Sequence, residues 1–278
     1  MPNGGAGRAT SGRRDDIDTD LRILHLHPSV LNVAGDGGNV RALEQRARWR
    51  DIDVAIRRAD PGEELDPTWA DITVIGGGQD TEMRVAADGL REQAPALRES
   101  VESGAVLFAV CAGLQLLGRV YVPISGDPIE GLGMLDLETR GGPTRFMQHA
   151  ACDVELDGET STVVGFENHS GLTQLGPDAR PFGTVVLGAG NNGEDGTEGA
   201  VPADGSPILS TYLHGPVLPK NPWLTDKLLA LALARRHGPQ TLSRLADRTE
   251  ERAHDEALGA ARRAAGRRTA IPAARLGR

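Results

Sequence analysis

Apolar residues gather in short runs along this chain, and each run gives way to glycine, proline or charged residues. Five of these runs predict strands: residues 21–27, 53–56, 71–75, 105–110 and 208–213. The run at 105–110 contains no polar residue, which is typical of a strand buried on both faces of a parallel sheet. We therefore expect a mostly parallel sheet at the centre of the fold.

Longer segments between the strands carry apolar residues at helical spacing. Three of them predict helices: residues 40–49, 95–103 and 222–237. Pro95 and Pro222 suit the first turn of a helix, and Gly104 and Gly238 suit its end. Asn221 is expected to cap the last helix. Strands that alternate with helices predict βαβ units, and hence an α/β fold with helices flanking a doubly wound sheet.

After residue 118 the pattern changes to short alternating stretches that are broken by glycine and proline. Residues 134–139 and 152–156 alternate apolar and polar positions, so we expect short antiparallel strands in this region. Residues 188–199 are rich in glycine, asparagine and acidic residues, which predicts a loop.

The sequence divides into a disordered tail at residues 1–20, one domain at residues 21–238, and a C-terminal extension at residues 239–278. The extension is Ala-, Arg- and Glu-rich and is either helical or disordered. Hydrophobic residues make up 39% of the chain but aromatic residues only 3%, so the core must be aliphatic.

Charge and cysteine content exclude several classes of function. The net charge of −9 argues against binding to nucleic acid or to an anionic membrane. Cys111 and Cys152 are too few for a disulfide framework and lack the spacing of a metal site.

No apolar run approaches the ~20 residues that a membrane-spanning helix needs, and the amino terminus lacks a secretory apolar segment. We expect a soluble cytoplasmic protein with no transmembrane segment.

Cys111 stands where the apolar run at 105–110 turns through Ala112 and Gly113 into a short helix. The end of a buried strand and the start of a helix favour an anion, such as a thiolate. This is the pattern of a nucleophile elbow with cysteine in place of serine. The alternative is a buried cysteine that acts only as a small hydrophobe.

Two other features follow predicted strands. They are the glycine run 76–78 and His214. Ligands of open α/β sheets bind at the carboxyl ends of the strands, so both features are expected to meet Cys111 in one crevice. Histidine can activate a thiol, and glycine N–H groups can face an oxyanion. The alternative for the glycine run is a tight turn without a ligand, and the alternative for His214 is a structural histidine at the end of a strand. We interpret Cys152, His25 and His27 as structural.

The motifs of these strand ends resemble those of class I (Triad) glutamine amidotransferases, in the branch that includes cobyric acid synthases. They are VCAGLQ at residues 110–115, GGGQD at 76–80 and YLHGP at 212–216. ENHSG at residues 167–171 and LHGPVLPKNP at 213–222 are similar, more narrowly, to the GatD group of glutaminase subunits. The resemblance covers about residues 21–238.

This resemblance implies the class I glutamine amidotransferase fold and the hydrolysis of L-glutamine to glutamate and ammonia. Cys111 would attack the side-chain amide and form a γ-glutamyl thioester, while His214 would move the protons. The oxyanion would be held by the N–H groups of Ala112 and of Gly77 or Gly78. Four residues match positions that bind glutamine in the family: Arg145, Gln115, Asn168 and Ser170. A guanidinium such as that of Arg145 suits a carboxylate.

The resemblance also implies a partner, because the GatD group forms heterodimers with a MurT-like Mur ligase. That partner would use ATP and Mg²⁺ to activate the D-glutamate carboxylate of lipid II in peptidoglycan synthesis. The implied role includes cell-wall biogenesis and cell shape. No cofactor and no metal are expected in this chain.

The chain departs from the family pattern at two positions. Ala109 replaces a common glycine, and Pro216 stands where most Triad enzymes have an acid two residues after the histidine. Either the Cys–His dyad suffices, or an acid comes from elsewhere in the chain or from the partner. Three other functions remain open: ammonia supply to a corrinoid ligase, a stand-alone DJ-1-like or peptidase-like hydrolase, and a non-catalytic regulatory subunit.

Overall fold

A parallel sheet of five strands forms the centre of the protein. The computed structural model describes residues 19–265 and 270–272, and the sheet has the order β13-β4-β3-β1-β2. Its strands are β1 (Leu21–Leu26), β2 (Val54–Ala59), β3 (Ile72–Ile75), β4 (Val106–Val110) and β13 (Ile208–Thr211). All neighbouring strands in it pair in parallel. The expected central sheet is therefore confirmed.

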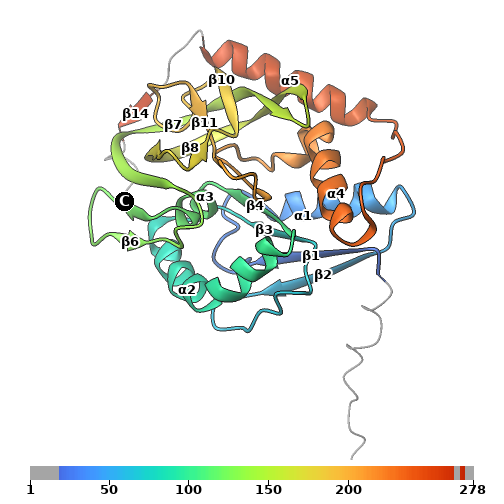
Figure 1. Cartoon of the computed structure of the whole chain (residues 1–278). Coiled ribbons are helices and arrows are strands. Elements are labelled where there is room, and N and C mark those ends of the chain that lie inside the picture. The colour runs from blue at the N-terminus through green and yellow to red at the C-terminus, as the bar shows by residue number, and fades with distance from the viewer. Residues whose placement is uncertain (1–18, 266–269, 273–278) are drawn as a thin grey trace, which may run out of the picture.

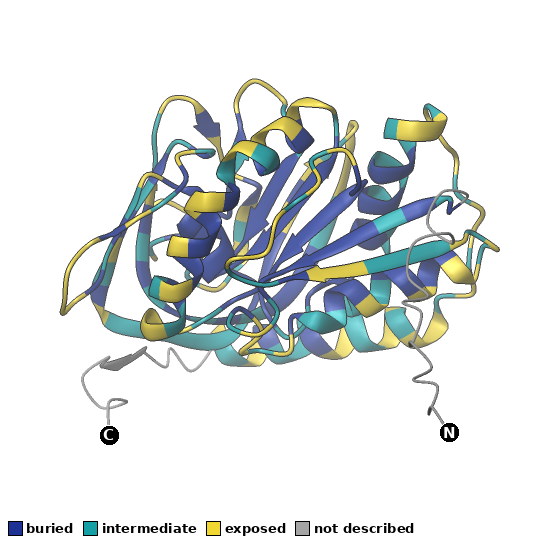
Figure 2. Ribbon diagram, turned by 90° about the horizontal axis from the view of Figure 1, so that it is seen from below, coloured by how far each residue is buried: buried dark blue, intermediate teal, exposed yellow. Residues whose placement is uncertain are grey.

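Helices α1 (Gly37–Arg48), α2 (Asp80–Glu102), α3 (Ala112–Leu117) and α4 (Pro222–His237) lie along the central sheet (Figure 1). The short 3₁₀ helix η1 (Leu218–Lys220) precedes α4, and α5 (Arg248–Ala265) lies over a second sheet. Figure 2 shows that the strands of the sheet are mostly buried, whereas the flanking helices expose their outer faces. This pattern is that of a sheet covered by amphipathic helices.

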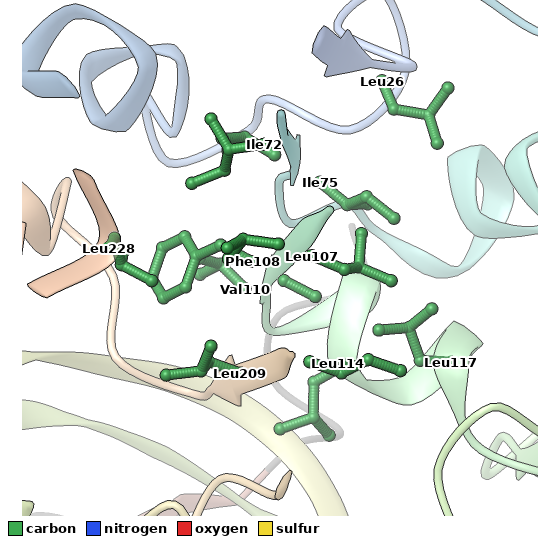
Figure 3. Close-up of a cluster of buried hydrophobic side chains, with 14 of the residues drawn as sticks. Leu26, Ile72, Ile75, Leu107, Phe108, Val110, Leu114, Leu117, Leu209 and Leu228 are labelled. Carbon is green, nitrogen blue, oxygen red and sulfur yellow. The ribbon is translucent and has the colours of Figure 1, made fainter. Parts of the chain in front are cut away.

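An aliphatic cluster joins the sheet to the helix that follows the elbow. Figure 3 shows Leu107, Phe108 and Val110 of β4 in the same cluster as Leu114 and Leu117 of α3. All five side chains are fully buried. The end of β4, which carries Cys111, is therefore fixed in a well-packed part of the core.

The helix expected at residues 95–103 is part of a much longer one, α2, and the expectation that Pro95 begins it is wrong. Pro95 lies inside α2, where it removes one backbone hydrogen bond at a cost of about 3 kcal/mol. Met83, Leu90 and Leu97 lie on the buried face of the same helix, before and after the proline. Burial of this continuous apolar face offsets the loss.

A second sheet lies over one edge of the first. Its strands are β5 (Val120–Val122), β6 (Ile129–Glu130), β7 (Leu137–Leu156), β8 (Glu159–Leu175), β10 (Gly183–Leu187), β11 (Thr197–Glu198) and β14 (Ala270–Pro272). A separate pair is formed by β9 (Ala179–Arg180) and β12 (Val201–Pro202).

The strands expected after residue 118 are mostly antiparallel, as predicted, but most of the region forms one long hairpin of β7 and β8 and not a series of short strands. The Gly141-Gly142-Pro143 sequence does not end β7; the pairing register shifts between Gly141 and Phe146 instead, which is the behaviour of a β-bulge. Residues 134–136 precede the strand rather than belonging to it. The loop expected at residues 188–199 contains the short strand β11 near its end.

Asn221 does not cap α4 with its side chain, contrary to expectation. Its Oδ1 atom accepts a hydrogen bond from the Val164 N–H (2.9 Å), and its Nδ2 atom donates to the carbonyls of Val164 and Val217. The side chain satisfies buried backbone groups of β8, which a cap would leave unpaired. Asn221 therefore fastens the start of α4 to the second sheet.

The C-terminal extension forms α5, which lies across the second sheet in Figure 1. Ala257 and Ala261 are its buried residues. The disordered tail expected at residues 1–20 falls almost entirely on residues 1–18, outside the described residues. No helix in the described part of the chain is both long and apolar enough to cross a membrane.

Candidate active site

Cys111 occupies a backbone conformation that most residues avoid. It lies between β4 and α3 with φ 51° and ψ −102°. Such strain costs about 1–3 kcal/mol and is concentrated at functional sites. Its N–H donates to the carbonyl of Thr211 at the end of β13 (2.8 Å). Gly113 allows the tight turn, because a Cβ atom there would lie 2.9 Å from Ile75 Cγ2.

His214 follows β13 and lies next to Cys111. It is 4% exposed, and its backbone exchanges hydrogen bonds with Phe166 of β8. The side chains of Cys111 and His214 interact electrostatically, and both flank Gly77, where an added Cβ atom would lie 3.4 Å from Cys111 Cβ. Gly77 lies against the imidazole, since a Cβ atom at this glycine would approach His214 Cε1 to 2.6 Å. The structure thus brings all three predicted strand ends together.

Asp36 completes this group, and the sequence analysis missed it. The residue is fully buried in the loop after β1. Its Oδ1 atom lies 3.4 Å from His214 Nδ1, and its Oδ2 atom accepts a hydrogen bond from the Gly77 N–H (2.7 Å). An acid that precedes its histidine by 178 positions has no spacing signal. Its place after the first predicted strand was the only available clue, since ligands gather at strand ends.

The charges around His214 favour its protonated form. Burial alone would lower the pKa of this histidine, but the neighbouring Cys111 sulfur and the Asp36 carboxylate raise it to about 10. His214 is therefore an imidazolium at neutral pH. A thiolate beside an imidazolium is the activated form of a cysteine nucleophile.

The backbone N–H groups of Ala112, Gly77 and Gly78 were expected to stabilise an oxyanion, and they differ in whether they already have an acceptor. The Gly77 N–H already donates to Asp36. Ala112 is the first residue of α3, where an N–H has no acceptor within its own helix. Gly78 stands just before the residue that caps α2. Of the two glycines expected to act in this way, Gly78 is the one whose N–H is not donated to Asp36.

The residues expected to bind glutamine lie on α3 and on the β7–β8 hairpin. Gln115 is almost fully buried, and its Nε2 atom donates to the Tyr212 hydroxyl (3.0 Å). A Cβ atom at Gly171 of β8 would lie 2.4 Å from the same Nε2 atom. Gln115 therefore contacts the strand that carries Asn168 and the half-buried Ser170.

Arg145 of β7 donates from Nε to Asn168 Oδ1 (2.8 Å). His169 follows Asn168 on β8, and its ring stacks on Tyr212, two residues before His214, with the centroids 3.7 Å apart. Burial lowers the pKa of His169 to about 3, and the charges of His214 and Arg145 lower it as well. The charges of Arg145 and His214 thus act on the same buried ring, that of His169.

The three residues interpreted as structural, Cys152, His25 and His27, form no hydrogen bond with Cys111 or His214 in the described part of the chain, although the charge of Asp36 acts on His25. Burial raises the pKa of Cys152, a β7 residue in the core. His27 Nε2 hydrogen-bonds to Gln93 of α2 (2.7 Å).

Comparison with known proteins gives a consistent result. The model of the CobB/CobQ-like glutamine amidotransferase domain matches residues 22–222. The chain is 39% identical over 221 residues to the lipid II isoglutaminyl synthase (glutamine-hydrolyzing) subunit GatD of Staphylococcus aureus (strain N315), covering 79% of this chain and 87% of that protein. The corresponding subunit of Streptococcus pneumoniae (strain ATCC BAA-255 / R6) is 35% identical, with 82% and 86% covered.

A more distant similarity extends to larger enzymes. The cobyric acid synthase of Limosilactobacillus reuteri (strain DSM 20016) is 31% identical over 224 residues, which are 78% of this chain but 41% of that protein.

Proposed function

Since this chain belongs to the CobB/CobQ-like glutamine amidotransferase family, we propose that it supplies ammonia to a ligase that amidates lipid II. The chain is an enzyme that hydrolyses glutamine, as its GatD relatives do. The observation that carries the proposal is the buried Cys111–His214 pair at the strand-to-helix elbow, with Asp36 behind the histidine.

In the first half of the reaction, Cys111 Sγ attacks the side-chain carbonyl carbon of glutamine. The carbonyl oxygen gains the negative charge and accepts hydrogen bonds from the N–H groups of Ala112 and Gly78. His214 then gives its proton to the leaving nitrogen. The C–N bond breaks, ammonia leaves, and a γ-glutamyl thioester remains on the sulfur.

In the second half, neutral His214 takes a proton from water, and the hydroxide attacks the thioester carbonyl. The C–S bond breaks, which releases glutamate and restores the thiolate beside the imidazolium. Asp36 stabilises each protonated form of His214 and holds its Nδ1 side in place.

The α-carboxylate of glutamine would bind Arg145, which Asn168 orients through its side-chain oxygen. A planar guanidinium can hold a carboxylate through two parallel hydrogen bonds. Gln115 and Ser170 would line the remaining part of the substrate site. This arrangement would favour glutamine over amides that lack an α-carboxylate.

The ammonia would pass to a MurT-like Mur ligase in a heterodimer. The similarity to GatD over most of both chains supports this partner. The ligase would bind ATP and Mg²⁺ and amidate the D-glutamate carboxylate of lipid II, which would link the pair to cell-wall synthesis and cell shape. We place the protein in the cytoplasm, where its free cysteines would stay reduced.

The experiment compares three samples: this protein alone, the protein with a co-expressed Mur ligase, and the same complex with Cys111→Ala. We expect glutamate release from L-glutamine, and amidation of lipid II only with the active complex and ATP. The Cys111→Ala complex should amidate lipid II with added ammonium but not with glutamine. Amidation from glutamine by that variant would refute the role of Cys111, and amidation of a corrinoid in place of lipid II would refute the proposed acceptor.

A further inference from the structure

Glu198 of β11 contacts Thr211 and Tyr212, which precede His214 in the chain. The residue is 1% exposed. Its Oε1 atom accepts hydrogen bonds from the Thr211 hydroxyl (2.5 Å) and from the Tyr212 N–H (2.8 Å). The carboxylate therefore connects a strand of the second sheet to the end of β13 in the first.

Thr211 links the nucleophile to the base. Its carbonyl accepts the hydrogen bond of the Cys111 N–H (2.8 Å), and its hydroxyl oxygen accepts that of the Leu213 N–H (3.0 Å). Leu213 directly precedes His214. The Thr211 hydroxyl thus donates its proton to Glu198 and accepts the Leu213 N–H with a lone pair, so that Glu198 sets the direction of this lone pair.

We infer that Glu198 is a positioning residue for glutamine hydrolysis, which holds residues 211–213 so that the imidazole of His214 meets the sulfur of Cys111. The inference rests on the proposed function and names a residue outside the reacting group. Glu198 acts through the backbone and does not contact the substrate.

Loss of this carboxylate should affect the chemical step more than substrate binding. The Tyr212 ring is held independently, because it stacks on His169 and its hydroxyl bonds to Gln115 and Thr173. The glutamine-binding residues should therefore keep their places when Glu198 is removed. The His214 backbone keeps its two hydrogen bonds with Phe166 of β8, whereas the Thr211 hydroxyl, which accepts from the Leu213 N–H, loses the carboxylate that holds it.

A glutamine at this position should preserve the function. Burial, together with the charge of nearby Glu167, raises the pKa of Glu198 to about 7. Its Oε2 atom is buried and has no hydrogen-bond partner among the described residues. A glutamine side chain has the same shape, and its oxygen can accept both hydrogen bonds that Oε1 accepts now.

The experiment compares Glu198→Ala, Glu198→Gln and the control Asp71→Ala in the complex with the ligase. Asp71 is also a fully buried carboxylate that accepts a backbone N–H, from Arg22. It lies just before the amino-terminal end of β3, the middle strand of the central sheet, whereas Cys111 and His214 follow the carboxyl ends of β4 and β13. Steady-state glutaminase kinetics and thermal unfolding are measured for each variant. The alkylation rate of Cys111 by iodoacetamide is measured against pH.

For Glu198→Ala we expect kcat to fall by about 10- to 100-fold, since small misplacements of reacting groups have effects of this size. KM should change by less than about threefold. The alkylation profile should shift to higher pH, because the imidazolium no longer lies against the sulfur. Glu198→Gln should recover most of the activity, and Asp71→Ala should lower the melting temperature while kcat stays within about twofold of the wild type.

An unchanged kcat and an unchanged alkylation profile in folded Glu198→Ala would overturn the inference. Equal losses of kcat in Glu198→Ala and Asp71→Ala would also overturn it, because the effect would then be one of general stability. Failure of the proposed function is distinguishable: the wild-type complex would not hydrolyse glutamine, whereas the shift in alkylation would still report on the position of His214.

Discussion

Asp36 performs two tasks with its two oxygens. One oxygen faces His214 Nδ1, and the other accepts a hydrogen bond from the Gly77 N–H. The second contact fixes the orientation of the carboxylate toward the imidazole. The family's usual acid position, two residues after the histidine, holds Pro216 here. A proline side chain cannot accept a hydrogen bond, and the carboxylate that faces His214 in this structure is Asp36, in the loop after β1.

Asp36→Asn should lower kcat by about 100-fold or more, within the usual range for general acid–base catalysis. The substitution keeps the shape but removes the charge that raises the pKa of His214. That pKa should therefore fall from about 10. The loss of kcat/KM at alkaline pH should begin at lower pH in the variant than in the wild type. Glutaminase assays across pH 6–11 measure both effects, and an unchanged alkaline limb would contradict the role given to Asp36.

At this scale the sequence was informative where a residue follows a recognisable strand. The glycine run 76–78, Cys111 and His214 were expected at one edge of the sheet, and they lie there. Arg145, Asn168 and Ser170 came only from the family resemblance, because a residue in the middle of a long strand has no local mark of function. Asp36 needed the fold, since only the parallel pairing of β1 with β3 brings its loop beside Gly77.

Among the secondary-structure elements, α2 shows most clearly how packing overrides a local signal. The helix continues through Pro95, whose side chain is exposed, and keeps one buried apolar face from Met83 to Val101. The long β7–β8 hairpin shows the same effect, since β8 pairs with β7 both before and after its glycines. Sequence patterns predicted the existence of most elements, but tertiary contacts decide where these two end.

Pro95→Ala should raise the free energy of unfolding by about 1–3 kcal/mol. The alanine restores the backbone N–H of an interior helical position, although the greater freedom of the unfolded chain offsets part of the gain. Urea unfolding measures the change, with Glu92→Ala at an exposed position of the same helix as the control, for which we expect a change within about 0.5 kcal/mol. A destabilised Pro95→Ala variant would show that the proline is needed for packing.

At the scale of the whole molecule, a buried charge cluster joins the C-terminal extension to the domain. Arg46 of α1 is 3% exposed and pairs with Asp226 of α4 (2.7 Å) and with Asp247 (2.6 Å), the residue before α5. Arg50 also pairs with Asp226 (2.6 Å). The extension lies beyond the matched family region, residues 22–222, and its charge partners come from inside that region.

Asp247→Ala should lower the free energy of unfolding by about 1–3 kcal/mol, because it removes charge-assisted hydrogen bonds from a buried arginine. Limited proteolysis should also cut the segment before α5 faster. The control is Asp255→Ala, an exposed carboxylate on α5 itself. Equal proteolysis rates in the two variants would mean that the alanine face of α5, rather than the charge cluster, holds the extension in place.

The alternation of strands and helices predicted the architecture of the molecule, including its parallel sheet and aliphatic core. It did not predict how the second sheet lies on the first. That arrangement depends on side chains such as Asn221 and Glu198, whose partners are 57 and 13 positions away. Polar groups that satisfy distant backbone atoms leave no periodic trace in a sequence.

The left-handed backbone at Cys111 implies a conflict between durability and chemistry at one position. Glycine would adopt that geometry without steric cost, so a chain chosen for robustness alone would favour losing the sulfur. Variants selected only for heat tolerance, without a screen for turnover, are thus expected to replace Cys111 by glycine and to lose activity. The reactive thiol persists only where selection for ammonia release outweighs the energetic cost of the strained backbone at Cys111.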